Sequence, residues 1–250
     1  MGKKKKNSNY VTEKRILAQA EAERAKKAAQ TKKIIIYSVV SVLIVAALVL
    51  GIWGIVTLIN NADREANPNI DFKATHHASI EIEGYGTLHV ELYGDDAPIT
   101  VNNFVKLANE GFYNGKTFHR VMEDFMIQGG CPEGNGTGDY KDENGKEVNI
   151  KGEFSANGVK NDIKHIRGTI SMARGGYDND SASCQFFIVQ KTSTNNTLSL
   201  DGNYAAFGMV TDGMEIVDKI VDDMKKLGYS EAVDAKDQPV IKSITIHESH

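Results

Sequence analysis

The chain has 250 residues and a formal net charge of −4, and its length alone allows one large domain or two small ones. The charge is unevenly distributed: residues 1–33 carry eleven Lys or Arg and three Glu, whereas residues 60–250 carry eighteen basic and thirty acidic residues. The acidic excess of the longer part argues against a nucleic acid as its partner.

Residues 34–59 form an uncharged, apolar stretch between these two parts. As a helix with a rise of about 1.5 Å per residue, the stretch would span about 39 Å, more than the roughly 30 Å hydrocarbon core of a bilayer. We therefore predict a transmembrane helix at 34–59 that contacts membrane lipid. Residues 1–33 are predicted to form a basic and largely helical arm, and their charge places the N-terminus in the cytoplasm. The prediction is a single-pass protein of the cell membrane with an extracytoplasmic domain.

A cleavable signal peptide is the alternative to an anchor. Its apolar region would have about 7 to 15 residues and would precede a small-x-small cleavage site. Residues 60–64 read Asn-Asn-Ala-Asp-Arg and contain no such site. An uncleaved anchor is the preferred interpretation, and release by cleavage after Ala62 stays open as an alternative that changes the location but not the chemistry.

The pattern after a short linker at 60–75 is typical of a β-rich domain, predicted at 76–250. Residues 78–83 and 87–92 alternate apolar and polar side chains on either side of a Gly-Tyr-Gly turn, which predicts a hairpin. Such short strands favour a closed barrel, which has no exposed edges.

Two helices and a closing strand complete the predicted domain. The first helix is predicted to begin at Asp96-Ala97-Pro98, because proline is tolerated in the first turn of a helix. The second is predicted at 214–221 and the closing strand at 241–246. Residues 131–167 are predicted as a long loop, with Glu153-Phe154 pinned to the barrel.

Three blocks of sequence carry most of the information about function. Phe-His-Arg-Val-Met-Glu-Asp-Phe-Met-Ile-Gln-Gly-Gly occupies 118–130, Ser-Cys-Gln-Phe-Phe-Ile-Val occupies 183–189, and Leu-Asp-Gly-Asn-Tyr-Ala-Ala-Phe-Gly occupies 200–208. Because side chains alternate along a strand, Phe118 and Arg120 are predicted to share one face. His119 is predicted to lie on the other face and to have a structural role.

In this order the blocks resemble those of the cyclophilin family of peptidyl-prolyl isomerases, over about residues 77 to 248. The resemblance implies a mainly β fold, a closed eight-stranded antiparallel barrel with a helix over each end. It also implies cis-trans isomerisation of X-Pro bonds in unfolded or flexible polypeptides, here by a membrane-anchored bacterial member that acts in extracytoplasmic protein folding. A non-catalytic module that binds Pro-containing segments is the alternative, and the arginine at position 120 disfavours it because binding alone would not require it.

The resemblance also assigns site residues. Arg120 matches the catalytic arginine, and Gln128 matches the glutamine that holds the substrate backbone and orients the arginine. Rotation about an amide bond needs no metal or cofactor, so none is predicted. The other matches are to substrate-binding positions, namely Phe118, Phe125, Met126, Ala173, Gln185, Phe187, Leu200 and Tyr204.

Two departures from the family pattern concern ligand preference. Ser199 replaces a Trp that supports cyclosporin binding in many members, so weak cyclosporin binding is expected. Residues 174–177, Arg-Gly-Gly-Tyr, differ from the usual Asn-Ala-Gly type of segment, which leaves the preference for residues beside the proline open.

Cys131 and Cys184 are the two cysteines of the chain, and each lies close to a block that carries site residues. Because disulfides persist outside the cytoplasm, a bond between Cys131 and Cys184 that ties the long loop to the site wall is a hypothesis. Residues 139–147 only faintly resemble a calcium loop, since Tyr140 and Lys151 stand where acidic ligands are required.

Overall fold

The computed structural model describes residues 72–193 and 197–248. By its internal contacts the chain divides after Ala66, and all described residues belong to the second unit, Asn67–His250. The predicted arm 1–33, the predicted transmembrane helix 34–59 and most of the predicted linker lie outside the described residues. Within 72–193 and 197–248, no helix has the length and apolar character needed to cross a membrane.

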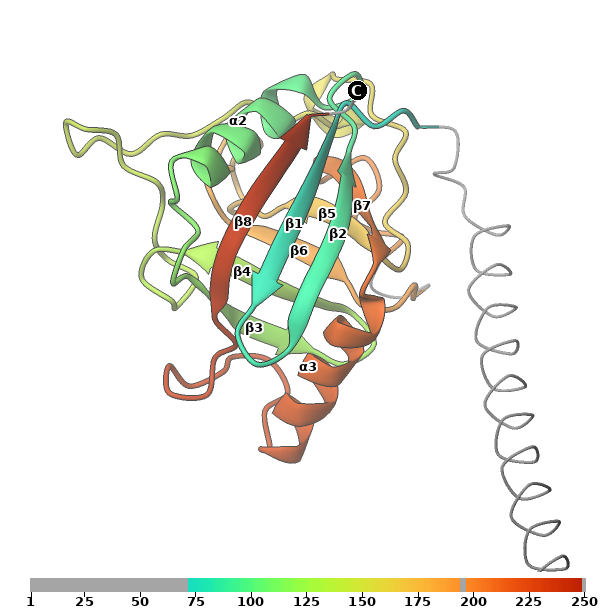
Figure 1. Cartoon of the computed structure of the whole chain (residues 1–250). Coiled ribbons are helices and arrows are strands. Elements are labelled where there is room, and N and C mark those ends of the chain that lie inside the picture. Colours follow the sequence, from blue (N-terminus) through green and yellow to red (C-terminus); the bar gives the residue numbers. More distant parts are fainter. Residues whose placement is uncertain (1–71, 194–196, 249–250) are drawn as a thin grey trace, which may run out of the picture. The chain divides into compact units, whose positions relative to one another are not determined.

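The described unit is built on one antiparallel sheet of eight strands, with the order β3-β4-β6-β5-β7-β2-β1-β8 (Figure 1). The predicted hairpin is confirmed as the pair β1 and β2, with Ile82 opposite Gly86 at the turn. The strands are β1 His76–Ile82, β2 Gly86–Leu92, β3 Thr117–Met122, β4 Met126–Cys131, β5 Thr169–Met172, β6 Phe186–Val189, β7 Ala206–Asp212 and β8 Ile241–Glu248.

The sheet is a half-barrel, so the prediction of a closed barrel is wrong. β3 and β8 are the two end strands, and no ladder joins them: Thr117 of β3 forms an isolated bridge with Val240, the residue before β8. Phe118 donates its backbone N–H to the Pro239 carbonyl at 2.9 Å. Pro239 has no N–H to return, and proline is confined to the edges of ladders for this reason. Regular pairing therefore stops at this seam.

Two α-helices lie at opposite ends of the sheet, as predicted (Figure 1). The first, α2 Pro98–Asn109, begins with proline in its first turn. Two backbone N–H groups of its first turn, which have no partner within the helix, donate to the buried carboxylate of Glu153. Oε1 accepts the Ile99 N–H at 3.0 Å, and Oε2 accepts the Thr100 N–H at 2.7 Å. A carboxylate at this end also interacts favourably with the helix dipole. Glu153 is thus attached to the helix, whereas Phe154 is buried in the main core, as the predicted attachment to the barrel requires.

The second helix, α3 Met214–Lys226, is longer than predicted. Ile216, Val217, Ile220 and Val221 are buried, and Met224 extends the same apolar face by one turn. Lys225 and Lys226 in the last turn favour the extension, because cations are stabilising near a helix C-terminus.

The main core lies between α2, α3 and the inner face of the sheet. Phe104 of α2 is at its centre, with ring centroids 5.3 Å from Tyr113, 5.5 Å from Phe186 and 5.2 Å from Phe207. These rings come from segments far apart in the sequence, so their packing fixes α2 against the strands that carry the site described next.

Candidate active site

A row of side chains runs across four neighbouring strands of the sheet. Arg120 on β3 is opposite Gln128 on β4, Gln128 is opposite Phe187 on β6, and Phe187 is opposite Ser171 on β5. Residues directly opposite each other in an antiparallel sheet point to the same face. Strand pairing therefore brings Arg120 and Gln128 together with Phe187, although they come from two separate blocks of sequence.

A β-bulge on β3 changes which of its side chains share a face. Phe118 is opposite Gly129 and Arg120 is opposite Gln128, so one step on β4 corresponds to two residues on β3, and His119 is the extra residue. The side chain of Phe118 is fully buried in the main core, with its ring 5.9 Å from that of Phe186. The prediction that Phe118 binds substrate on the face of Arg120 is therefore wrong, because simple alternation fails at the bulge.

The predicted polar residues form one hydrogen-bonded chain. Arg120 Nη1 donates to Gln128 Oε1 at 3.4 Å, and Gln128 Nε2 donates to Gln185 Oε1 at 3.0 Å. Gln185 Nε2 in turn donates to the carbonyls of Gly136 and Gly138, both at 3.0 Å. Gln185 thus fixes the orientation of Gln128 and holds the glycine-rich part of the long loop.

Arg120 has a second partner that the sequence did not indicate. Its Nε and Nη2 lie 2.9 and 2.8 Å from Oε1 of Glu231. Glu231 is 111 residues away in the chain and outside all three blocks, so no pattern of spacing pointed to it.

An apolar cluster lies beside these polar residues on the same part of the sheet. It contains every other predicted substrate-binding side chain, and also Met122 and Val189, which the sequence analysis missed. Both follow a predicted residue by two positions on its strand, Arg120 and Phe187 respectively, a spacing that could have indicated them. The buried members are Met126, Phe187, Val189 and Leu200, and the partly buried ones are Met122, Phe125, Ala173 and Tyr204.

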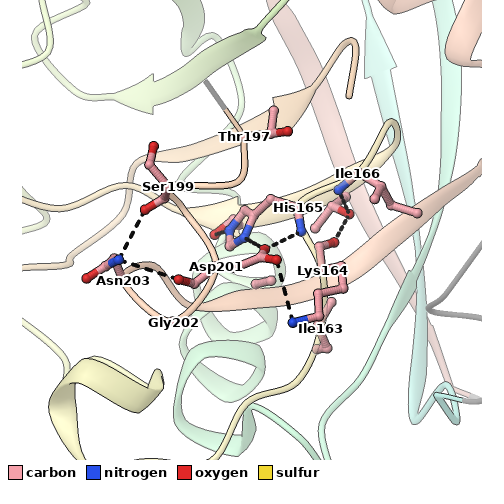
Figure 2. Close-up of polar contacts among 12 residues, drawn as sticks. Ile163, Lys164, His165, Ile166, Thr197, Ser199, Asp201, Gly202 and Asn203 are labelled. Carbon is pink, nitrogen blue, oxygen red and sulfur yellow. Dashed lines mark hydrogen bonds and ion pairs between the residues drawn. The ribbon is translucent and has the colours of Figure 1, made fainter. Parts of the chain in front are cut away.

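A buried histidine supports this cluster from behind. The ring of His165 is stacked on that of Phe187, with centroids 5.9 Å apart and an interplanar angle of 18°. Its Nδ1 lies 3.0 Å from Oδ1 of Asp201 (Figure 2). Its Nε2 lies 2.9 Å from Oγ of Ser171. An ionised carboxylate only accepts hydrogen bonds, so Nδ1–H of His165 donates to Asp201.

Asp201 connects this histidine to the segment that carries Leu200. Its Oδ1 also accepts the backbone N–H of His165 at 2.8 Å, and its Oδ2 lies 3.6 Å from Lys164 Nζ. Burial raises the pKa of Asp201, but the hydrogen bonds from His165 and the charges of His165 and Lys164 together outweigh it, so the pKa lies below its usual value of 3.8. Asn203 closes the segment by donating from Nδ2 to the Ser199 carbonyl at 3.1 Å (Figure 2).

Arg174, part of a segment that departs from the family pattern, lies against the rim of the cluster. Its guanidinium carbon is 4.7 Å from the ring centroid of Tyr204 and 5.2 Å from that of Phe154. Its Nε donates to the Asn203 carbonyl at 2.9 Å. Arg174 therefore fixes Tyr204, whose ring in turn meets Phe187 edge-on at 5.9 Å.

Both cysteines are free, buried thiols, so the hypothetical disulfide between Cys131 and Cys184 is not formed in the structure. Cys131 Sγ instead accepts the backbone N–H groups of Gly136 and Gly138, both at 3.3 Å. Burial raises the pKa of the Cys184 thiol to about 12. The loop is thus tied to the site wall by hydrogen bonds to Cys131 and Gln185.

Two other features lie apart from this site. A cavity beside α3 shares no residue with the apolar cluster; it is lined by Val121, Glu123, Val221, Lys225, Tyr229 and Ser230. Among residues 72–193 and 197–248, no group of three or more His, Cys, Asp or Glu side chains is arranged to hold a metal ion.

The fold is that of a structurally characterised class of proteins. A crystal structure of a cyclophilin type peptidyl-prolyl cis-trans isomerase from Cryptosporidium parvum, determined in the presence of the dipeptide Ala-Pro, is similar with a TM-score of 0.55 and 28% sequence identity. The similarity covers 69% of this chain and 99% of that one.

The chain belongs to the cyclophilin-type peptidyl-prolyl cis-trans isomerase family, since the family model described as "Cyclophilin type peptidyl-prolyl cis-trans isomerase/CLD" matches residues 77–250. A peptidyl-prolyl cis-trans isomerase of Helicobacter pylori strain J99 is 44% identical over 148 residues, which are 58% of this chain and 81% of the relative. Peptidyl-prolyl cis-trans isomerase B of Bacillus subtilis is 44% identical over 134 residues, 54% of this chain and 82% of the relative.

Proposed function

We propose that this peptidyl-prolyl isomerase lowers the barrier to rotation by directing a hydrogen bond from Arg120 to the nitrogen of the X-Pro bond. The barrier of about 18–20 kcal/mol arises because rotation breaks the resonance between that nitrogen and the carbonyl. As resonance is lost, the nitrogen lone pair becomes available to a donor. A donor placed there stabilises the transition state more than either ground state.

The observation that carries this proposal is the position of Arg120. Its side chain is 35% exposed and hydrogen-bonded to Gln128, which pairs with Phe187 in the apolar cluster. A proline ring resting on Phe187 and Leu200 would lie beside a permanently charged donor with several N–H groups. Gln128 is well placed to bind the substrate backbone, and Gln185 orients it.

The experiment is an isomerisation assay on the full-length chain in detergent, with a short peptide that contains a central Ala-Pro bond. Removing a preorganised donor costs about 100- to 1000-fold in kcat, which is the loss expected for Arg120→Ala. Arg120→Lys retains the charge but loses the planar fork, so it should restore only a small part of the rate. Thermal unfolding of both variants controls for folding. Wild-type kcat in folded Arg120→Ala would refute the role of the arginine.

We further propose an extracytoplasmic setting, with the enzyme tethered to the membrane by residues 34–59. The support is the uncharged stretch and the basic excess before it. Uncatalysed isomerisation takes about 10–100 s at 25 °C, slow enough to limit folding. A tethered isomerase would meet Pro-containing polypeptides soon after they cross the membrane, while they are still unfolded.

A further inference from the structure

Glu231 is held beside Arg120 by its own main chain. Val121 donates its N–H to the Glu231 carbonyl at 2.8 Å, and Val233 donates to the His119 carbonyl at 3.0 Å. These bonds flank an isolated antiparallel bridge between Arg120 and Ala232. The segment 231–233 thus pairs like a short strand with β3, on the side opposite β4. The contact between Glu231 and Arg120 is therefore fixed by backbone pairing as well as by two flexible side chains.

The carboxylate of Glu231 and the amide of Gln128 occupy different edges of the guanidinium. Glu231 Oε1 binds the edge formed by Nε and Nη2, at 2.9 and 2.8 Å. Gln128 Oε1 binds Nη1 at 3.4 Å. Arginine has five N–H groups in a rigid plane, so these contacts leave one N–H on Nη1 and one on Nη2.

We propose that Glu231 is a positioning residue for isomerisation: it fixes the guanidinium plane of Arg120 so that the free N–H groups point toward the bound prolyl nitrogen. The inference rests on the role proposed above for Arg120. The Arg120 side chain has several rotatable bonds, so a single contact with Gln128 leaves its guanidinium plane free to turn. A second contact on the opposite edge removes that freedom before substrate binds, which is the preorganisation that electrostatic catalysis requires.

If the ion pair served only to stabilise the fold, loss of Glu231 would lower the melting temperature, and the positioning role predicts otherwise. The side chains of Arg120 and Glu231 are 35% and 56% exposed, and exposed ion pairs contribute little to folding stability. Loss of Glu231 should therefore leave thermal unfolding almost unchanged while it lowers kcat.

The test compares Glu231→Ala and Glu231→Gln with the wild type in the full-length chain. Glu231→Ala should lower kcat by about two- to fivefold, the range that the coupling of an exposed pair allows, with KM unchanged. Glu231→Gln keeps an acceptor oxygen and should recover at least half of the lost rate. Glu123→Ala is the matched control, because Glu123 is 50% exposed and pairs with Lys225 rather than Arg120.

A second readout does not depend on turnover. The Nε–H proton of Arg120, observed by NMR, should exchange with water faster in Glu231→Ala than in the wild type, and should stay slow in the control. An unchanged kcat in Glu231→Ala, or an increased one, would overturn the inference. If Arg120→Ala is nevertheless inactive, only the role of Glu231 fails. If folded Arg120→Ala keeps the wild-type kcat, the proposed function itself fails.

Discussion

Phe186 and Phe187 are adjacent on β6 but serve different parts of the molecule. Phe186 is fully buried in the main core against Phe104, whereas Phe187 belongs to the apolar cluster beside Arg120. Because neighbouring residues of a strand point to opposite faces, two identical side chains have separate roles here. The pair therefore provides a matched test of the site.

Phe187→Leu should lower kcat/KM by about tenfold, because the proline ring loses aromatic contact surface. Phe186→Leu should leave kcat/KM close to the wild-type value and should lower the melting temperature by about 3 to 6 °C, since it leaves a poorly filled core. Peptide isomerisation and thermal unfolding of both variants are the measurements. Equal effects of the two substitutions on kcat/KM would contradict the assignment of Phe187 to the site.

The pKa of Asp201 predicts a pH dependence of stability. Burial raises this pKa, but the hydrogen bonds from His165 and the nearby positive charges together lower it, so the folded protein binds a proton at Asp201 less readily than the unfolded chain. The resulting stabilisation is fully present above the unfolded pKa of about 3.9 and is lost as the pH falls through the lower, folded pKa.

Asp201→Asn should therefore be less stable than the wild type at neutral pH, and the difference should shrink below about pH 4. Denaturant unfolding at several pH values measures it. Asp162→Asn is the control, because the Asp162 side chain is 65% exposed in its contact with Lys160. A difference between Asp201→Asn and the wild type that persists unchanged at pH 3 would contradict the mechanism.

At the scale of elements, the start of α2 depends on a residue from the long loop. Glu153 accepts three hydrogen bonds there, including one from Thr100 Oγ1 at 2.7 Å. Glu153→Gln keeps one acceptor oxygen but loses the charge that faces the helix dipole. The expected cost is about 1–2 kcal/mol, or roughly 3 to 6 °C in melting temperature.

Thermal unfolding of Glu153→Gln beside Glu147→Gln measures this cost. Glu147 lies in the same loop and is 60% exposed, so its substitution should have almost no effect. Unchanged stability of Glu153→Gln would show that the loop carboxylate does not hold α2.

Individual helices and hairpins were more predictable than the irregular places where strands pair. The hairpin 78–92 and the proline at the start of α2 follow local rules, and the structure contains both. The bulge at His119 and the seam at Pro239 depend on which strand lies alongside, and a single sequence does not contain that information. Family resemblance named Gln128, Phe187 and Leu200, and the structure brings them to one region of the sheet, although their roles in catalysis stay predictions. The contact of Glu231 with Arg120 and the stacking of His165 on Phe187 arise only from tertiary pairing.

At the scale of the whole molecule, the membrane anchor predicted at 34–59 stays a prediction. The full-length protein should sediment with membranes, resist extraction by high salt and dissolve in detergent. A variant without residues 1–59 should remain soluble and keep the isomerase activity, because the family match begins at residue 77.

Protease added to intact cells should digest the domain after residue 60 and spare a tagged N-terminus. The same treatment of lysed cells should remove both and serves as the control. Recovery of the full-length chain in the soluble fraction, or protection of the domain in intact cells, would contradict the predicted topology.

The half-barrel gives the two sides of the site unequal mechanical support. β6, which carries Phe187, has a ladder on each side, whereas β3, which carries Arg120, has one ladder and, on its other side, only the isolated bridges to Val240 and Ala232. Amide protons on β3 should accordingly exchange with deuterium sooner than those on β6. A substrate would then contact a rigid strand, β6, through its proline ring. It would contact a less rigid strand, β3, through the hydrogen bond from Arg120.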